Sequence, residues 1–489
     1  MTGSLPNILG FFRPAAVGLG CALFCAPVPG VTQVRDGLPE VLAGSAVGDV
    51  TGYALADTRD GRWIDAYGET GARVPASVLK IVTALYGLDV LGPNYRFSTS
   101  VLATGPVEDG VLSGDLVLVG GGDPALDAND LKEIVADLAE ARLSKVEGRF
   151  VVVTGALPEL AVIEPDQPLH VGYNPAISGL NLNFNRVRLT WIAGEDGPVF
   201  GFGAPGTGFE VLVEGVAGEL GEESPPRHRV EDGREVWTLD AGKMRRDGAV
   251  WLPVRDAAKY AAEVFASLAG EQGIELPEPE FVAEAPEGEV LVEHLGAPLI
   301  DVLRGMLRYS TNLTAEVVGL QAAKENGEAP LRLEESALAM TAWARERYGL
   351  EDAVFIDHSG LSDRSRWSAE ETVEVLLAES GRLPLILPLR PMPGGIEDAP
   401  DGAFVAAKTG TIYFSSGLAG YLGDAERSLA FAVYSSEPER REGIDTFSGE
   451  PPAGARVWGN RARELQKNLL TAWFAAEMPP LPLRPMPRP

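Results

Sequence analysis

The chain has 489 residues, of which 45% are hydrophobic and 23% charged, and its formal net charge is −29 at pH 7. This composition is that of a soluble globular protein, and the length predicts about three domains. The acidic balance argues against nucleic-acid binding, because such a surface repels phosphate backbones.

The first 30 residues are typical of an export signal. Arg13 precedes an apolar stretch from Ala15 to Ala26, which is too short to span a bilayer. We therefore expect residues 1–30 to be a signal peptide, and the mature protein to be periplasmic with no stable membrane span. Both cysteines, Cys21 and Cys25, lie in this segment, so we expect no disulfide and no cysteine metal site after its removal. A lipid anchor at Cys21 is the less favoured alternative, because the residue three positions upstream is not Leu.

Strand-like segments occur near both ends of the chain. The first two flank Asp60-Gly61, a strong hairpin pair, and an amphipathic helix that opens at Pro75-Ala76-Ser77 follows them. The predicted strands are Thr51 to Thr58, Arg62 to Tyr67, Phe404 to Thr411, Leu418 to Leu422 and Leu429 to Tyr434. We predict an α+β fold in which these strands form one antiparallel five-stranded sheet flanked by helices, with a large two-part inserted region.

The inserted region separates the two halves of that sheet. It contains predicted helices at Asp130 to Ala141 and Ala257 to Gly270, and a β-branched run at Phe150 to Thr154. The predicted domains are a discontinuous domain that contains this sheet (31–95 and 290–478), an inserted domain (96–170 and 247–289), a nested β-rich domain (171–246) and a disordered Pro-rich tail (479–489).

Ser77-Val78-Leu79-Lys80 is the first of three motifs that stand in a fixed order. Ser77 and Lys80 are three residues apart at a helix start, so their side chains share one face, and the helix N-terminus stabilises negative charge on the serine oxygen. Lys80 can act as a base only when neutral. Lowering its pKa from about 10.4 to near 7 costs roughly 4–5 kcal/mol, which burial and a second cation, Lys408, can supply. An isolated motif of this kind is more often a solvent-facing pair, and the other two motifs favour the catalytic interpretation.

Ser310-Thr311-Asn312 is the second motif, and it precedes a predicted helix from Leu313 to Ala323. Residues at i and i+2 of a connecting loop can both point into a cleft. We expect Ser310 to relay a proton between Lys80 and the leaving amine, and Asn312 to hold a substrate amide. An ordinary helix N-cap is the alternative for Ser310 or Asn312, and both roles can hold together.

Lys408-Thr409-Gly410-Thr411 is the third motif and lies late in a predicted strand. We expect Lys408 and Thr409 to bind a substrate carboxylate, while Gly410 lets the backbone approach closely. The N–H groups of Thr411 and Ser77 can form an oxyanion hole. Because all three motifs lie in the segments that flank the insert, we expect the cleft to form without it.

These residues resemble the penicillin-recognising serine hydrolases, and more narrowly the low-mass class C penicillin-binding proteins, which are D-alanyl-D-alanine carboxypeptidases and endopeptidases. The 233 positions between Ser77 and Ser310 leave room for the inserted domains of this family, whereas a class A β-lactamase has only a short helical segment there. Further matching stretches are Arg73 to Ser77, Gly114 to Leu116, Gly122 to Pro124, Tyr173 to Asn185, Asp357 to Ser362 and Ala407 to Tyr421.

The resemblance implies a serine DD-peptidase that acts on peptidoglycan peptide stems, binds β-lactam antibiotics and needs no metal or cofactor. Ser77 would attack the carbonyl of the penultimate D-Ala, and water would then free the acyl-enzyme. Two alternatives stay open: a β-lactamase or esterase of the same superfamily, and a catalytically weak cell-wall binding protein. The balance of carboxypeptidase and endopeptidase activity, the third residue of the peptide stem and the oligomeric state also stay open.

Three positions depart from the family pattern. Thr311 stands where Asp is usual, His358 where Gly is usual, and Asp363 where Arg is common. We expect Thr311 to alter loop packing without touching the chemistry, and His358 to be a surface or core residue. The four histidines lack the HExxH spacing, so a zinc hydrolase is unsupported, and the chain has no G-x-S-x-G elbow.

Overall fold

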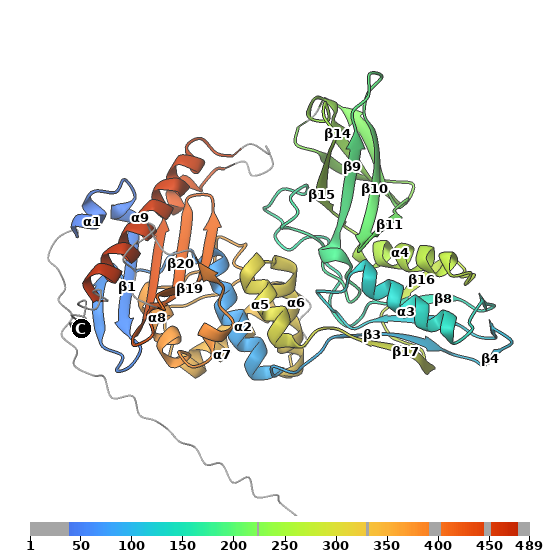
Figure 1. Cartoon of the computed structure of the whole chain (residues 1–489), viewed down its shortest axis with the longest axis horizontal. Coiled ribbons are helices and arrows are strands. Elements are labelled where there is room, and N and C mark those ends of the chain that lie inside the picture. The colour runs from blue at the N-terminus through green and yellow to red at the C-terminus, as the bar shows by residue number, and fades with distance from the viewer. Residues whose placement is uncertain (1–38, 223, 329–331, 391–401, 445–450, 478–489) are drawn as a thin grey trace, which may run out of the picture.

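The computed structural model describes residues 39–222, 224–328, 332–390, 402–444 and 451–477 (Figure 1). The predicted signal peptide and Pro-rich tail lie outside these residues. None of the described helices is long and apolar enough to cross a membrane.

A mixed α+β domain is built around one antiparallel sheet, to which both ends of the chain contribute (Figure 1). The order of its strands is β18 (Leu389–Arg390), β19 (Phe404–Ile412), β20 (Ser415–Gly423), β21 (Ser428–Ser436), β1 (Thr51–Asp57) and β2 (Trp63–Tyr67). The five predicted strands are therefore confirmed and lie in one sheet. The short β18, which pairs with β19 at the edge, makes the sheet six-stranded, so the predicted count of five was one too few.

Helices cover both faces of this sheet because its central strands alternate between two cores. In β1, Ala54 and Ala56 face one hydrophobic cluster, while Tyr53 and Leu55 face the other. Helices of the first cluster are α2 (Lys80–Val90), α5 (Leu299–Tyr309), α6 (Asn312–Glu325), α7 (Leu333–Tyr348) and α8 (Ala369–Ala378). Helices of the second are α1 (Glu40–Ala43) and α9 (Ala455–Glu477).

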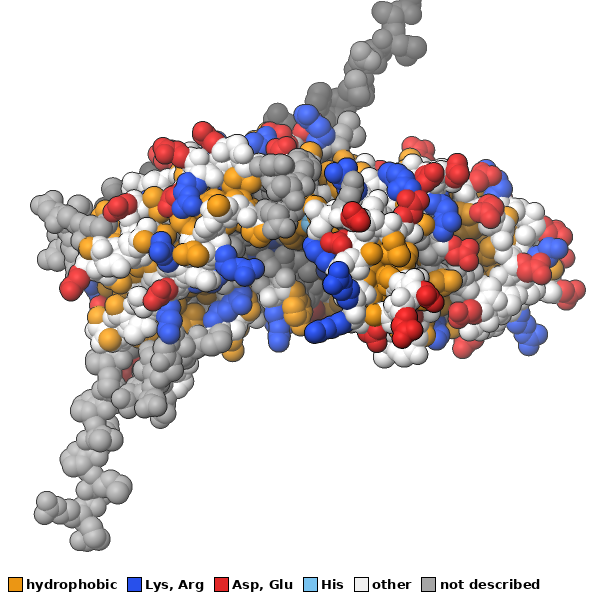
Figure 2. All heavy atoms as spheres, turned by 90° about the horizontal axis from the view of Figure 1, so that it is seen from above, with side chains coloured by type: hydrophobic (Ala, Val, Ile, Leu, Met, Phe, Trp, Pro, Cys, Tyr) orange, Lys and Arg blue, Asp and Glu red, His pale blue; other side chains and the backbone are white. Residues whose placement is uncertain are grey.

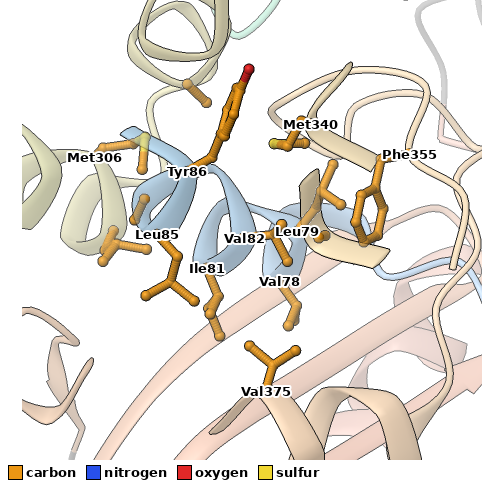
Figure 3. Close-up of a cluster of buried hydrophobic side chains, with 14 of the residues drawn as sticks. Val78, Leu79, Ile81, Val82, Leu85, Tyr86, Met306, Met340, Phe355 and Val375 are labelled. Atoms are coloured by element: carbon orange, nitrogen blue, oxygen red, sulfur yellow. The ribbon is translucent and has the colours of Figure 1, made fainter. Parts of the chain in front are cut away.

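The helix α2 lies in the middle of the first cluster and is buried along most of its length. Figure 3 shows its apolar side chains, and those of the turn before it, among residues of the neighbouring helices and loops. The residues labelled there are Val78, Leu79, Ile81, Val82, Leu85, Tyr86, Met306, Met340, Phe355 and Val375. A helix enclosed in this way holds its first turn in a fixed position relative to the sheet.

The inserted region carries sheets of its own. A five-stranded sheet has the order β16 (Pro279–Val282), β8 (Phe150–Val153), β6 (Leu116–Gly120), β3 (Ser98–Ala103) and β17 (Glu289–Leu295). Two helices, α3 (Ala128–Glu140) and α4 (Ala257–Glu271), share a hydrophobic core with it. Seen from above, acidic side chains gather over this end of the molecule (Figure 2).

Smaller sheets complete the inserted region. One contains β11 (Phe209–Leu212), β10 (Val199–Gly206), β9 (Arg186–Ile192) and β15 (Gly248–Pro253), and another contains β12 (Val216–Gly221), β14 (Arg234–Asp240) and β13 (Arg227–Glu231). A third contains β4 (Val107–Glu108), β5 (Val111–Leu112) and β7 (Lys145–Val146). Residues of β9 and β14 belong to the same hydrophobic core as α3 and α4. The proposed division of the insert into an inserted and a nested domain stays a prediction.

Candidate active site

The Ser77 side chain projects from a tight turn ahead of α2. Residues Ala76–Leu79 form a 3-10 turn, and Ala76 has a left-handed backbone with φ of 47°. Two glycines let other segments contact this turn. A Cβ atom at Gly360 would overlap the Ala76 carbonyl, and one at Gly410 would lie 3.0 Å from the Ser77 backbone nitrogen. The turn is thus held between β19 and the loop that contains Gly360.

The Lys80 amine is fully buried and lies at the centre of a small polar network. Its Nζ atom is 3.0 Å from Ser77 Oγ, 2.7 Å from Asn312 Oδ1 and 2.7 Å from the Ser359 carbonyl oxygen. Burial lowers the pKa of Lys80 to about 8, against the opposing influence of the negative charges of Asp357 and Glu316. At neutral pH a useful fraction of this amine is therefore uncharged.

The second motif enters the same network from the connection between α5 and α6. Ser310 ends α5 with a left-handed backbone, φ 59°, and Thr311 is the N-cap residue of α6. Asn312 begins α6 and donates from Nδ2 to the Tyr173 carbonyl at 2.8 Å, which fixes the orientation of its amide. The Asn312 oxygen consequently faces Lys80.

The third motif supplies a second buried amine. Lys408 is fully buried, and its Nζ atom donates to Ser310 Oγ at 2.9 Å and to the Thr409 carbonyl at 2.7 Å. Burial, followed by the nearby cations Lys80 and Arg390, lowers the pKa of Lys408 well below its ordinary value. Each of the two buried amines thus contacts one serine hydroxyl, Lys80 that of Ser77 and Lys408 that of Ser310.

A cleft of about 730 Å³ opens over these residues. Of the predicted site residues, Ser77, Ser310, Asn312 and Thr411 line it. Lys80 and Lys408 are buried behind this lining, whereas Thr409 is exposed on β19 and is not one of the lining residues. Thr409 and Thr411 are two residues apart in one strand, so their side chains point to the same face of the sheet.

The insert contributes to this cleft, which corrects the expectation that the cleft forms without it. Asp166, Gln167 and Tyr173 line the cleft, and the Tyr173 carbonyl accepts the hydrogen bond from Asn312. Arg441, which follows β21, lines the cleft as well and pairs with Asp363 at 3.0 Å. None of these four cleft residues was selected as a site residue from the sequence.

The three departures from the family pattern have separate structural settings. Thr311 Oγ1 donates to Thr314 Oγ1 at 2.9 Å, within the first turn of α6. His358 is a core residue, one of the two settings expected for it: its ring packs against Gly319 and lies 2.8 Å from Ser336 Oγ, and burial lowers its pKa to about 3. Asp363 forms the ion pair with Arg441.

Potential metal ligands gather elsewhere in the described residues. Asp130 and Glu133 of α3 lie near His294 of β17, with one candidate ligand atom from each within 4.8 Å of the others. This group belongs to the inserted region and shares no residue with the cleft.

Comparison with known proteins defines the family. The sequence profile of the D-Ala-D-Ala carboxypeptidase 3 (S13) family matches residues 34–449. The chain belongs to this family. It is therefore a serine-type D-Ala-D-Ala carboxypeptidase, as the resemblance of the three motifs implied.

Individual relatives agree with this assignment over most of the chain. A D-alanyl-D-alanine carboxypeptidase of Actinomadura sp. (strain R39) is 27% identical over 458 residues, which cover 85% of this chain and 83% of that protein. D-alanyl-D-alanine carboxypeptidase DacB of Haemophilus influenzae is 24% identical, over 83% of this chain and 87% of its own. The crystal structure of penicillin binding protein 4 of Haemophilus influenzae has the same fold, with a TM-score of 0.70 and 20% identity, over 88% of this chain and 99% of that one.

Proposed function

We propose that Ser77 is the nucleophile of this carboxypeptidase and that neutral Lys80 is the base that activates it. The three neighbours of the Lys80 amine carry this proposal. A neutral amine has two N–H groups and one lone pair. The Asn312 and Ser359 carbonyl oxygens can only accept hydrogen bonds, so they take both N–H groups. The lone pair is then left for the hydroxyl proton of Ser77, 3.0 Å away.

The reaction proposed from this arrangement has two stages. Ser77 Oγ forms a bond to the carbonyl carbon of the penultimate D-Ala while its proton passes to Lys80. The bond to the terminal D-Ala nitrogen then breaks, and that nitrogen receives the proton from Lys80 through the hydroxyl of Ser310, which is held by Lys408. Water attacks the resulting ester while its proton passes to Lys80. The bond between the acyl carbon and Ser77 Oγ then breaks, and Lys80 returns the proton to Oγ as the shortened peptide leaves.

The substrate is proposed to lie along β19. The N–H groups of Ser77 and Thr411 would stabilise the oxyanion, and the hydroxyls of Thr409 and Thr411 would bind the terminal carboxylate beside the Lys408 charge. Asn312 has one amide N–H beyond the one given to Tyr173, and this N–H is available to a substrate amide.

The wider role that we propose follows from the family and from the cleft. The chain would be exported to the periplasm, would trim or cleave peptide stems of peptidoglycan there, and would bind β-lactams as acylating analogues of D-Ala-D-Ala. A crystal structure of the related Haemophilus influenzae protein is a complex with a β-lactam.

Mass spectrometry of the purified protein tests both the nucleophile and the activity. Benzylpenicillin should add its mass to the tryptic peptide that contains Ser77, and purified muropeptides should lose terminal D-Ala or their cross-links. Ser77→Ala should abolish both while keeping the thermal unfolding transition of the parent. A folded Ser77→Ala protein that still takes the label would contradict the assignment. Rapid penicillin turnover without any peptide cleavage would favour a β-lactamase instead, and acylation with intact muropeptides would favour a binding protein.

A further inference from the structure

One buried carboxylate beside the catalytic network has no role in the reaction above. Glu316 lies one helical turn after Asn312 on α6, so both side chains point to the same side of the helix. Its side chain is fully buried. Its two oxygens accept the backbone N–H groups of His358, at 3.0 Å, and of Ser359, at 2.9 Å. Glu316 thus holds two consecutive peptide groups of the loop that reaches Lys80.

The next peptide group of that loop is the one that contacts the amine. The Ser359 carbonyl accepts from Lys80, and the N–H of Gly360 in the same peptide group donates to Asp357 at 2.7 Å. The loop is also tied to α2, because Thr83 donates to the His358 carbonyl at 2.6 Å. The direction of the Ser359 carbonyl therefore depends on two carboxylates, Asp357 through its own peptide group and Glu316 through the two peptide groups before it.

We propose that Glu316 is a positioning residue for the acylation of Ser77. Through the His358 and Ser359 N–H groups it directs the Ser359 carbonyl that orients the Lys80 amine, and its negative charge, together with that of Asp357, favours the protonated form of that amine. This inference rests on the proposed role of Lys80 as the base.

The charge of Glu316 acts within a crowded set of ionisable groups. Its negative charge raises the pKa of Lys80, in opposition to burial. Burial, and then the charge of Asp357, raise the pKa of Glu316 itself, whereas the two loop N–H groups and Lys80 lower it. The groups that face Lys80 or its charged neighbours are Glu316 on α6, Asp357 on the loop, Lys408 on β19, Glu164 of the insert and Arg390 on β18.

Glu316→Gln disturbs both parts of this role, and the two effects are measured separately in the pH–rate profile. Glutamine keeps the length of the side chain but has a single acceptor oxygen, so one loop N–H loses its partner and the Ser359 carbonyl is held less firmly. We expect the plateau rate of acylation by benzylpenicillin to fall roughly ten- to a hundredfold. Loss of the negative charge should also lower the pKa of Lys80, so the acid limb of the pH–rate profile should move to lower pH.

Glu371→Gln is the matched control. Glu371 on α8 is also buried and also holds a loop by accepting backbone N–H groups, those of Glu351, Asp352 and Ala353. It has no contact with Lys80 among the described residues. Its substitution should reduce thermal stability while leaving the acid limb at the pH of the parent protein.

The outcomes distinguish this inference from the proposed function. An acid limb that stays in place in folded Glu316→Gln protein would overturn the positioning role, whereas a parent protein whose acylation rate has no acid limb would overturn Lys80 as the base. If Glu316→Gln does not fold, Glu316→Asp supplies the test. It keeps the charge but is shorter, so the plateau should fall while the limb stays in place, and an unchanged plateau would overturn the role.

Discussion

Replacement of Lys80 by arginine tests the base directly, because arginine keeps a cation near Ser77 but cannot give up its proton. With a pKa of about 8, roughly one tenth of the Lys80 side chains are neutral at pH 7. For an arginine with a pKa above about 12, this fraction is below roughly one in 10⁵. The remaining acylation rate is then the rate without a general base, and general-base catalysis typically contributes about 10²- to 10⁴-fold. We expect the acylation rate to fall by that factor.

The assay is the second-order rate of acylation by benzylpenicillin at pH 7, measured for the parent and for Lys80→Arg. Because the amine is fully buried, near-ultraviolet circular dichroism and thermal unfolding must show that the larger side chain is accommodated. Lys467→Arg, on the exposed side of α9, is the control for the exchange itself and should acylate at the parent rate. A loss of less than tenfold in folded Lys80→Arg protein would refute the base role and would leave Lys80 as an electrostatic partner.

Three further outcomes follow from residues around the site. Thr311→Asp should change the acylation rate by no more than about twofold, because Asp is a preferred N-cap residue and the Thr311 hydroxyl contacts Thr314 rather than the amines. Gly319→Ala should cost about 1–3 kcal/mol in urea unfolding, because its Cβ overlaps the His358 ring, and combining it with His358→Gly should recover part of that loss. The contribution of His358 to the free energy of unfolding should be present in full above about pH 6.5 and should decrease towards pH 3. The reason is that unfolded His358 takes up a proton that the folded side chain, with a pKa of about 3, does not. His358→Gln should flatten this decline, and an unchanged slope would contradict the assignment.

The sheet and its motifs could be predicted because their signals are local. The Asp60-Gly61 hairpin pair marked the first two strands, and Pro75-Ala76-Ser77 placed Ser77 at a helix start. The two-residue β18 is too short to be recognised as a strand from sequence, which is why the sheet was predicted with one strand too few. The grouping of Ser77, Lys80 and Ser310 followed from chemistry, since a serine nucleophile without histidine needs an amine and a relay nearby.

Two residues that position Lys80 and Asn312 could not be predicted because they act through backbone atoms. Ser359 serves through its carbonyl oxygen, and Tyr173 likewise accepts from Asn312 with its main chain, so neither side chain marks the role in the sequence. The spacing of Glu316 was a weak indication of a role in the site, because it stands four residues after Asn312 on the same helical face. Because glutamates on helices are usually exposed to solvent, the sequence alone does not indicate that this one is buried.

The contribution of the insert to the cleft follows from the same backbone contacts. The Tyr173 carbonyl holds Asn312, and the adjacent Asn174 carbonyl accepts from the Arg255 guanidinium at 2.8 Å, which also binds the Ala161 carbonyl. Arg255 directly follows Val254, a residue of the hydrophobic core shared by α3 and α4. A rigid core in the insert is thus connected, through one loop and two consecutive carbonyls, to the amide that orients Lys80. Excision of residues 171–246 would remove Tyr173 and leave the Asn312 amide free to turn, so the insert supports the catalytic geometry as well as forming part of the cleft wall.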